Sequence, residues 1–363
     1  MRKKLVYYIT PHGFGHAVRS LEVIRLMLEL MPDLEVTVVS DLPGFLIEEC
    51  VGRPLNMRRR RLDIGLVQLD SLRFDLPATL DALRELMASG EALIEEEIRF
   101  LKTQGARGIV SDISFLPFFA SFRCGLPSIG LSNLSWDWIY ESYARMDGGW
   151  REVIEWIREG YRRCDLFLRL PMHGDCSTFP NIRDVPLISR GSERNREELR
   201  TVLSDDSGRK TYLISFAALE MDREAGKHLE KMNDRIFLFG KPLSFRLANT
   251  VCLEDLPLSY HEVVGAVDGV ITKPGYGIVS DCLAFGTPML YTDRGRFPEY
   301  EILVEEMHRR LTAIYIPSPQ LRSGDWEQAL TRLEESPRHY NPVRMDGASV
   351  CAHTILTQLF EVL

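Results

Sequence analysis

Short apolar runs, rich in β-branched residues, alternate along this chain with longer segments of helical periodicity. Such alternation is typical of βαβ units and therefore of parallel sheets. It occurs in two series, which a polar stretch at 189–210 separates. The sequence therefore predicts an α/β protein with two Rossmann-like domains. The expected strands are 5–10, 36–40, 108–112, 127–133 and 165–170 in the first series and 211–216, 235–240, 269–272 and 288–292 in the second, and the expected helices include 17–31, 79–104 and 347–362.

The length of the chain also favours two domains, because 363 residues exceed what one ordinary core holds. We expect an N-terminal domain at 1–190 and a C-terminal domain at 191–345. A last helix within 346–363 could pack back on the N-terminal domain.

Charge and hydropathy limit the partners that the chain can have. A formal net charge of −8 argues against a protein that binds nucleic acid by neutralising phosphates. No window approaches the 18 or so apolar residues of a transmembrane helix, and the first apolar run is too short for a signal peptide. We therefore expect a cytoplasmic protein. The run MRRRR at 57–61 is either a solvated loop or a basic patch for an acidic lipid surface, so peripheral membrane contact stays open.

The seven cysteines show no CxxC pair and no paired spacing. This pattern predicts reduced thiols, with neither a disulfide framework nor a zinc site.

A first glycine turn follows the first expected strand, in the string PHGFGHAV. Gly13 and Gly15 supply two of the three glycines of a dinucleotide fingerprint, and small residues there let the backbone approach an anion at a helix N-terminus. His12 and His16 flank the glycines, and a histidine at such a position can accept a proton near neutral pH. The alternative is a tight turn in which His16 caps the helix.

Two residues are candidates for a catalytic base. His16 is the first, and Asp112 is the second because it ends a buried strand. A helix N-cap is the alternative role for Asp112.

A second glycine turn, at 273–277, follows the expected strand 269–272 and precedes a helix with Ser280 and Asp281 near its start. Backbone N–H groups at a helix start suit a diphosphate, and an early acid can bind ribose hydroxyls. Glu299 and Glu301 follow the next strand and are candidates for contacts with a donor sugar, with surface solvation as the alternative. Gly240 and Lys241 end another strand, and Ser215, Phe216 and Ala217 follow an earlier one. The donor-binding candidates are thus Ser215, Phe216, Gly240, Lys241, Lys273, Gly275, Tyr276, Gly277, Ser280, Asp281, Glu299 and Glu301.

The second turn resembles the donor-binding half of GT-B glycosyltransferases, a group that includes the bacterial enzyme adding N-acetylglucosamine to lipid-linked muramyl peptides. The string TVSE of that pattern is matched here by residues 278–281. The sequence differs from that pattern at two positions that contact the donor. Asp281 occupies the position of the glutamate that contacts ribose, and Glu299 lies roughly where a glutamine is expected. The donor sugar can therefore differ.

Most of the chain is similar to the glycosyltransferase-like N-terminal region of plant-type L-arabinokinases. The strings that carry this similarity are YYITPHGFGHAVRSLEVIR, IVSDISFLPFFASFRCGLPSIGLSNLSWDWIYESY and GYGIVSDCLAFGTPMLYTDRGRFPEYEILV. The sugar-kinase half of those proteins has no counterpart in this sequence. The resemblance implies a GT-B fold with two parallel sheets facing across a cleft, with the acceptor in the N-terminal lobe and the nucleotide sugar in the C-terminal lobe.

The activity that the resemblance implies is transfer of a sugar from a nucleoside-diphosphate donor, with a UDP-sugar favoured, to an acceptor hydroxyl by inverting displacement. The sequence has no DxD string, so we expect a metal-independent reaction without a cofactor. Aromatic residues at 136–140 could form a platform for an acceptor sugar or belong to the core. The acceptor-binding candidates are His12, Gly13, Gly15, Arg19, Trp136 and Asp137.

Three other functions remain open at this point. A nucleotide-sugar epimerase or hydrolase shares the fold, and a non-catalytic sensor would bind a nucleotide sugar without turnover. An NAD-dependent oxidoreductase would use Gly13, Gly15 and Asp41, but the third glycine of its fingerprint is missing.

Overall fold

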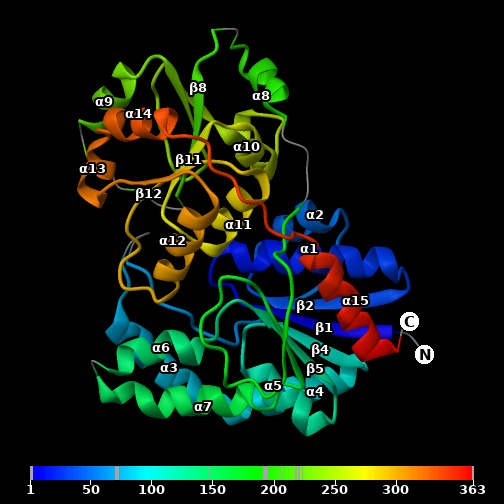
Figure 1. Cartoon of the computed structure of the whole chain (residues 1–363). Helices are drawn as coiled ribbons and strands as arrows, with labels where there is room; N and C mark the ends of the chain where they lie inside the picture. Colours follow the sequence, from blue (N-terminus) through cyan, green and yellow to red (C-terminus); the bar gives the residue numbers. More distant parts are fainter. Residues whose placement is uncertain are drawn as a thin grey trace. The chain divides into compact units, whose positions relative to one another are not determined.

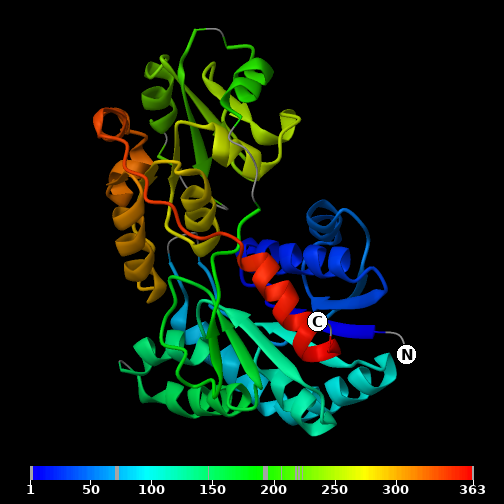
Figure 2. The ribbon, with the colours of Figure 1, turned by 45° about the vertical axis from the view of Figure 1, so that its right-hand side comes forward.

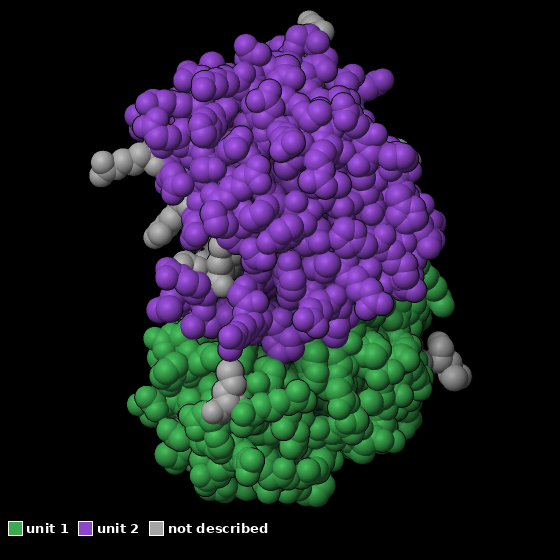
Figure 3. All heavy atoms as spheres, turned by 60° about the vertical axis from the view of Figure 1, so that its left-hand side comes forward, with its two compact units in different colours: residues 1–67, 75–189, 344–363 green, residues 68–74, 190–343 purple. Residues whose placement is uncertain are grey.

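The chain divides into two compact units, which Figure 3 distinguishes by colour. Unit 1 comprises residues 1–67, 75–189 and 344–363, and unit 2 comprises residues 68–74 and 190–343. The computed structural model describes residues 3–69, 73–145, 147–190, 195–205, 207–216, 219, 221–222 and 224–361. Part of the polar stretch at 189–210, namely 191–194 and Asp206, lies outside them. The short segment 68–74 groups with unit 2, although the sequence analysis assigned it to the N-terminal domain.

Unit 1 is built on a seven-stranded sheet in which all paired strands are parallel (Figure 1). The strand order is β3-β2-β1-β4-β5-β6-β7, so the order reverses between β1 and β4. Ligands of doubly wound sheets bind at such a switch point, outside the carboxyl ends of the strands. The strands are β1 (Lys3–Ile9), β2 (Leu34–Ser40), β3 (Asn56–Arg59), β4 (Gly108–Asp112), β5 (Ser128–Ser132), β6 (Leu166–Arg169) and β7 (Ile182–Asp184).

Helices cover this sheet, and the last helix of the chain belongs to unit 1. Helix α15 (Gly347–Phe360) packs against α1 (Phe14–Leu30), with the two lying side by side in Figure 2. The other helices are α2 (Gly44–Val51), α3 (Leu76–Ala88), α4 (Gly90–Gln104), α5 (Leu116–Cys124), α6 (Trp136–Ala144), the 3-10 turn η1 (Gly148–Trp150) and α7 (Arg151–Tyr161).

The expected helical stretch at 79–104 is present but divided, because the segment forms two helices that meet at Ser89. The Ser89 hydroxyl donates to the carbonyl of Glu85 at 3.0 Å, which is a side-chain bond that competes with helix continuation. A Cβ at Gly90 would lie 2.6 Å from the ring of Trp156, so this position lets α4 pack closely on α7.

Unit 2 is built on a six-stranded sheet of parallel pairs in the order β10-β9-β8-β11-β12-β13. Its core includes the fully buried side chains of Phe237, Leu290 and Trp326. The strands are β8 (Lys210–Ser215), β9 (Arg235–Phe239), β10 (Thr250–Cys252), β11 (Gly269–Thr272), β12 (Met289–Tyr291) and β13 (Ala313–Tyr315). The helices are α8 (Arg196–Leu203), α9 (Ala225–Lys231), η2 (Leu253–Asp255), α10 (Tyr260–Ala266), α11 (Tyr276–Phe285), α12 (Glu299–Arg310), α13 (Ser318–Ser323) and α14 (Glu327–Glu335).

The nine expected strands are present, and the four that the sequence analysis missed lie at sheet edges. β3, β7, β10 and β13 have only three or four residues each, and none is fully buried. Strands of three or four residues are shorter than the runs of four to eight apolar residues by which hydropathy detects a buried strand.

The arginine run at 57–61 is partly paired within unit 1, and Arg59 is exposed. Part of it forms β3, and Arg58 Nη1 lies 2.5 Å from Glu97 Oε1 on α4. Arg60 also pairs with a glutamate of α4, Glu96. Two of its arginines are therefore neutralised within unit 1.

Throughout the described ranges, no helix combines the length and the apolar character needed to cross a bilayer. All seven cysteines are described, and each is a free thiol.

Candidate functional site

The first glycine turn leads from the carboxyl end of β1 into α1. Gly13 is the N-cap of α1 and has a φ of +91°, a conformation that favours glycine. No side chain caps this helix start, so His16 does not have the capping role. Gly15 and His16 both lie in the first turn of α1.

His16 and Asp112 form a close pair between α1 and the end of β4. His16 Nδ1 lies 2.8 Å from Asp112 Oδ1, and the His16 side chain is 12% exposed whereas that of Asp112 is fully buried. Asp112 therefore lies behind His16, out of solvent. It is not a helix N-cap, because α5 begins four residues later with Phe115 as its N-cap.

Arg19 completes this buried network. Its Nε and Nη2 atoms donate to Asp112 Oδ2 and Oδ1 at 2.8 and 2.7 Å, which is a bidentate arrangement. Arg19 Nη2 also lies 2.8 Å from His16 Nδ1. Further bonds reach Ser132 Oγ at 2.9 Å and Asn133 Oδ1 at 2.8 Å, at the end of β5. Arg19 thus joins the carboxyl ends of two neighbouring strands to α1.

The network keeps Asp112 anionic. Burial by itself raises the pKa of this carboxyl, but the charges of Arg19 and His16 overcome that effect and hold the pKa well below its usual range. Asp112 as a carboxylate can only accept and Arg19 can only donate, so Nδ1 bonds to Asp112 when it carries a proton and to Arg19 when it does not. In the neutral imidazole with its proton on Nδ1, the other ring nitrogen, Nε2, carries the lone pair and can take up a proton.

A second buried carboxylate, Asp63, lies close to this turn. It accepts hydrogen bonds from Thr10 Oγ1 at 3.0 Å, Ser114 Oγ at 2.9 Å and Trp136 Nε1 at 3.3 Å. Burial raises its pKa, although these bonds oppose the shift. The sequence analysis missed Asp63, because it follows an irregular segment and belongs to no motif.

His12 packs against the loop that follows Asp63. Its ring meets the Trp136 ring edge-on with centroids 5.1 Å apart, and Leu66 N donates to its Nδ1 at 3.4 Å. A Cβ at Gly65, whose φ is +67°, would lie 2.3 Å from that nitrogen. His12 is therefore held in place by the loop.

Two of the aromatic residues at 136–140 follow the core alternative, and the third, Trp138, is half-buried. Trp136 and Tyr140 are buried and stacked, with centroids 5.7 Å apart, so they offer no open platform for an acceptor. Asp137 is also buried and accepts from Thr178 Oγ1 at 2.6 Å. Trp136, Asp137 and Tyr140 therefore belong to the interior of unit 1.

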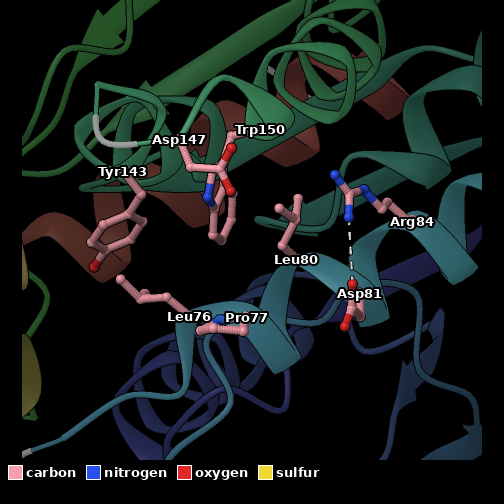
Figure 4. Close-up of a pocket in the computed structure, with 8 residues that line it drawn as sticks. All are labelled: Leu76, Pro77, Leu80, Asp81, Arg84, Tyr143, Asp147 and Trp150. Carbon is pink, nitrogen blue, oxygen red and sulfur yellow. Dashed lines mark hydrogen bonds and ion pairs between the residues drawn. The ribbon is translucent and has the colours of Figure 1, made fainter.

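The same aromatic series continues to a pocket within unit 1. Trp150 lies against both Tyr140 and Tyr143, with centroids 5.3 and 5.6 Å apart. Figure 4 shows Leu80 between the two aromatic rings and the Arg84–Asp81 pair, whose atoms Nη1 and Oδ1 are 3.4 Å apart. The pocket has a volume of about 280 Å³ and is lined by Leu76, Pro77, Leu80, Asp81, Arg84, Tyr143, Asp147 and Trp150, none of which the sequence analysis selected.

In unit 2, the second glycine turn leads from β11 into α11. Gly275 is the N-cap of α11, no side chain caps the helix start, and a Cβ at Gly275 would meet nothing within 4 Å. Tyr276 and Gly277 open the first turn, and Lys273 is half-buried. The hydroxyl of Ser280 is buried without a hydrogen-bond partner among the described residues. The N-cap Gly275 therefore supplies no side-chain acceptor to the N–H groups of this first turn.

Arg294 connects this turn to α12. Its Nη1 donates to Pro274 O at 3.1 Å and to Glu299 Oε2 at 2.7 Å, and its guanidinium lies 4.1 Å over the ring of Phe297. Glu299 is only 2% exposed, so its carboxylate serves this internal pair. Glu301 is exposed on α12.

The remaining donor candidates lie on α11 and around the carboxyl ends of β8 and β9. Asp281 Oδ1 is 3.3 Å from His261 Nδ1, and Ser215 Oγ is 2.5 Å from Tyr260 OH. Phe216 is part of the core. Gly240 and Lys241 follow β9, and Lys241 N donates to Glu254 Oε1 at 3.0 Å. Ala217 lies outside the described residues.

One acid at this edge escaped the sequence analysis. Asp293 follows β12 and accepts hydrogen bonds from Tyr315 OH at 2.9 Å and Ser318 Oγ at 2.8 Å. Its position just after a central strand was the available signal. Within the described parts of the chain, no group of three His, Cys, Asp or Glu side chains is placed to hold a metal ion.

No family model matches the sequence, but most of the chain is similar to a curated protein. The L-arabinokinase of Arabidopsis thaliana is 28% identical over 374 residues, which cover 96% of this chain. They cover 34% of that protein, so the chain spans about a third of the length of the relative it matches.

Solved structures of glycosyltransferases resemble the whole chain. The glycosyltransferase of kitacinnamycin has a TM-score of 0.62 at 15% identity, covering 99% of this chain and 95% of its own. UGT89C1 of Arabidopsis thaliana in complex with UDP has a TM-score of 0.60 at 15% identity, with 100% and 95% covered. The calicheamicin glycosyltransferase CalG4 has a TM-score of 0.60 at 14% identity, with 99% and 95% covered. The chain therefore has the GT-B fold of these glycosyltransferases.

Proposed function

We propose that this protein transfers a glycosyl group from a nucleoside-diphosphate donor to an acceptor hydroxyl, with His16 as the general base. The observation that carries the proposal is the His16–Asp112 pair at the carboxyl ends of β1 and β4, in a chain with the GT-B fold. A histidine whose Nδ1 faces a buried carboxylate is oriented to accept a proton at Nε2.

The proposed reaction is a single displacement at the anomeric carbon. Nε2 of His16 takes the acceptor proton while the acceptor oxygen forms its bond to that carbon. The bond to the diphosphate breaks with its electron pair, so the nucleoside diphosphate leaves and the configuration inverts. Asp112 does not touch the substrate, because it is buried. It acts as a positioning residue that stabilises the imidazolium, and Arg19 keeps it charged.

The donor is assigned to unit 2. The uncapped start of α11 offers N–H groups to the diphosphate, and Asp281 is the candidate for the ribose hydroxyls. A UDP-sugar is favoured, and the similarity to UGT89C1, which has been crystallised with UDP, supports this choice.

Metal independence is part of the proposal. The start of α11 supplies positive potential where the leaving group would develop charge. Transfer should therefore proceed in excess chelator, and a requirement for added Mg²⁺ or Mn²⁺ would contradict this part.

The experiment that tests the proposal measures the melting temperature with UDP, dTDP, GDP, UDP-sugars and NAD⁺, since a ligand that binds only the folded chain raises it. UDP or another nucleoside diphosphate should stabilise the wild type, and Asp281→Asn should remove most of this effect. Release of UDP from UDP-sugars over a panel of hydroxyl acceptors then tests catalysis. Stabilisation by NAD⁺ alone, lost in Asp41→Ala, would overturn the transferase proposal.

A further inference from the structure

The contact between α10 and α11 places a histidine against the acid that we assign to the ribose. His261 lies on α10, and Asp281 and Phe285 lie one turn apart on α11. His261 Nδ1 is 3.3 Å from Asp281 Oδ1, and its ring centroid is 4.7 Å from that of Phe285. A Cβ at Gly265, one turn after His261, would lie 3.0 Å from the Phe285 ring. The two helices therefore pack closely around this histidine.

The second ring nitrogen of His261 contacts the backbone where the main segment of unit 2 begins. Nε2 is hydrogen-bonded to the carbonyl oxygen of Arg190, the first residue of that segment. A carbonyl oxygen can only accept, so Nε2 carries a proton in this bond. The bond to Arg190 and the packing of Phe285 together fix the orientation of the ring, with Nδ1 toward Asp281.

Both ring nitrogens of His261 thus face an oxygen that accepts hydrogen bonds. The neutral imidazole has one N–H and can donate to one of the two, whereas the imidazolium has two and can donate to both. The side chain of His261 is 12% exposed and that of Asp281 is 21% exposed, so a ligand can reach the acid more easily than the histidine. An acid that is already held in one orientation loses less rotamer freedom when it binds a ligand.

We infer that His261 is a positioning residue that orients the carboxylate of Asp281 toward the ribose hydroxyls of the donor. The inference rests on the proposed function, because it takes Asp281 to bind the ribose. His261 acts through Asp281, so it should contribute to the affinity for a nucleoside diphosphate and not to the affinity for a diphosphate that lacks ribose. This property distinguishes it from a cation that attracts the diphosphate directly.

Two substitutions separate the roles of the two ring nitrogens. The amide N–H of His261→Asn takes roughly the place of Nδ1 and can donate to Asp281, whereas that of His261→Gln takes roughly the place of Nε2 and can donate to Arg190. The test is calorimetric titration of UDP, with inorganic pyrophosphate as a ribose-free competitor. His261→Ala and His261→Gln should weaken UDP binding about tenfold, as expected for the loss of one hydrogen bond to a charged group. His261→Asn should stay within about threefold of the wild type, and the affinity for pyrophosphate should not change in any variant.

A second histidine of unit 2 provides the matched control. His228 is half-buried on α9, and its Nδ1 lies 3.0 Å from the carbonyl oxygen of Ser323. His228→Asn should leave UDP affinity within about twofold of the wild type.

A double-mutant cycle tests whether His261 acts through Asp281. In an Asp281→Asn background, His261→Ala should cause no further loss of UDP affinity, because the group that it positions has been replaced. Thermal melts at high UDP concentration measure the weaker binding of these variants.

Four results would contradict these expectations. If UDP binds His261→Ala as tightly as it binds the wild type, the positioning role is overturned while the donor site stands. If UDP and pyrophosphate weaken by the same factor, or if His261→Ala costs as much in the Asp281→Asn background, His261 acts on the fold or on the diphosphate and the inference is overturned. If His261→Asn loses as much UDP affinity as His261→Gln, the contact of Nδ1 with Asp281 is not the cause, which also overturns it. If no nucleoside diphosphate binds the wild type, the proposed function and the inference both fail.

Discussion

The two glycine turns have the same backbone arrangement but different neighbouring side chains. Each follows a central strand of its sheet, and each begins its helix at a glycine without a side-chain cap. In unit 1, polar and charged groups from β4, β5 and α1 fill the space beside the turn and bond to one another. A Cβ would meet nothing within 4 Å at either Gly13 or Gly275, but in unit 2 the buried hydroxyl of Ser280 has no partner in the described chain.

The difference indicates how one fold motif serves two tasks. A saturated network fixes charges and proton positions, which a general base needs. An unfilled helix start leaves its N–H groups for an anion from outside. We therefore interpret the turn of unit 1 as the proton-handling part of the molecule and the turn of unit 2 as its anion-binding part.

Replacing His16, the proposed base, should have the largest effect, and it should lower turnover without changing donor binding. His16→Ala should lower kcat by about 10²- to 10⁴-fold, because proton transfer by a positioned side chain contributes that much. UDP affinity should not change, because the donor is assigned to unit 2. Steady-state kinetics with calorimetric UDP titration measures both quantities, and His353→Ala, an exposed histidine of α15, is the control. Unchanged turnover in His16→Ala would remove His16 from the mechanism.

Breaking the unit 1 network should cost about 3–5 kcal/mol of the free energy of unfolding, because Arg19→Leu leaves the buried charge of Asp112 without its main partner. Urea denaturation monitored by circular dichroism measures this. Arg25→Leu on the same helix is the matched control, since Arg25 is partly exposed and pairs only with glutamates one turn away. It should cost at most about 1 kcal/mol. A similar cost for both variants would refute the role assigned to the network.

The cost of Arg19→Leu should shrink as the pH falls from 7 toward 4. In the wild type the folded-state pKa of Asp112 is lowered, so its contribution is complete above the unfolded-state pKa near 4 and is lost only below it. In the variant, burial without Arg19 raises that pKa, and protonation relieves the buried charge. Between pH 7 and pH 4, the cost should fall by about 1.4 kcal/mol for each unit by which the folded-state pKa of Asp112 in the variant exceeds about 4. Urea titrations at several pH values test this, and a cost that grows on acidification would contradict it.

A smaller effect compares one serine in each turn. Ser20 donates to Asp112 Oδ2 at 2.9 Å, so Ser20→Ala should destabilise the fold by about 1.5–3 kcal/mol. Ser280→Ala should be neutral or slightly stabilising in the ligand-free protein, because it removes a buried hydroxyl that has no partner in the described chain. Thermal melts of both variants suffice. Equal destabilisation by the two substitutions would remove the contrast between the turns.

The candidate site was predictable to the extent that it depends on local sequence. Gly13 and Gly275 both mark real strand-to-helix turns, and at Gly13 the positive φ is a conformation that glycine tolerates. Arg19 was named without a partner, and its partner Asp112 is 93 residues away in the sequence. A side chain's partner depends on which strands lie side by side, and hydropathy does not carry that information.

By itself, the sequence determined the alternation of strands and helices, the parallel character of both sheets and the position of the two turns. These properties arise from residue spacing and from burial of apolar side chains, which act over a few residues at a time. Only the tertiary structure decided that Asp112 lies behind His16, that Asp63 is a second buried carboxylate beside the first turn, and that Tyr260 is anchored on Ser215. Each of these contacts joins segments that strand order brings together, because a hydrogen bond depends on distance in space and not on distance along the chain.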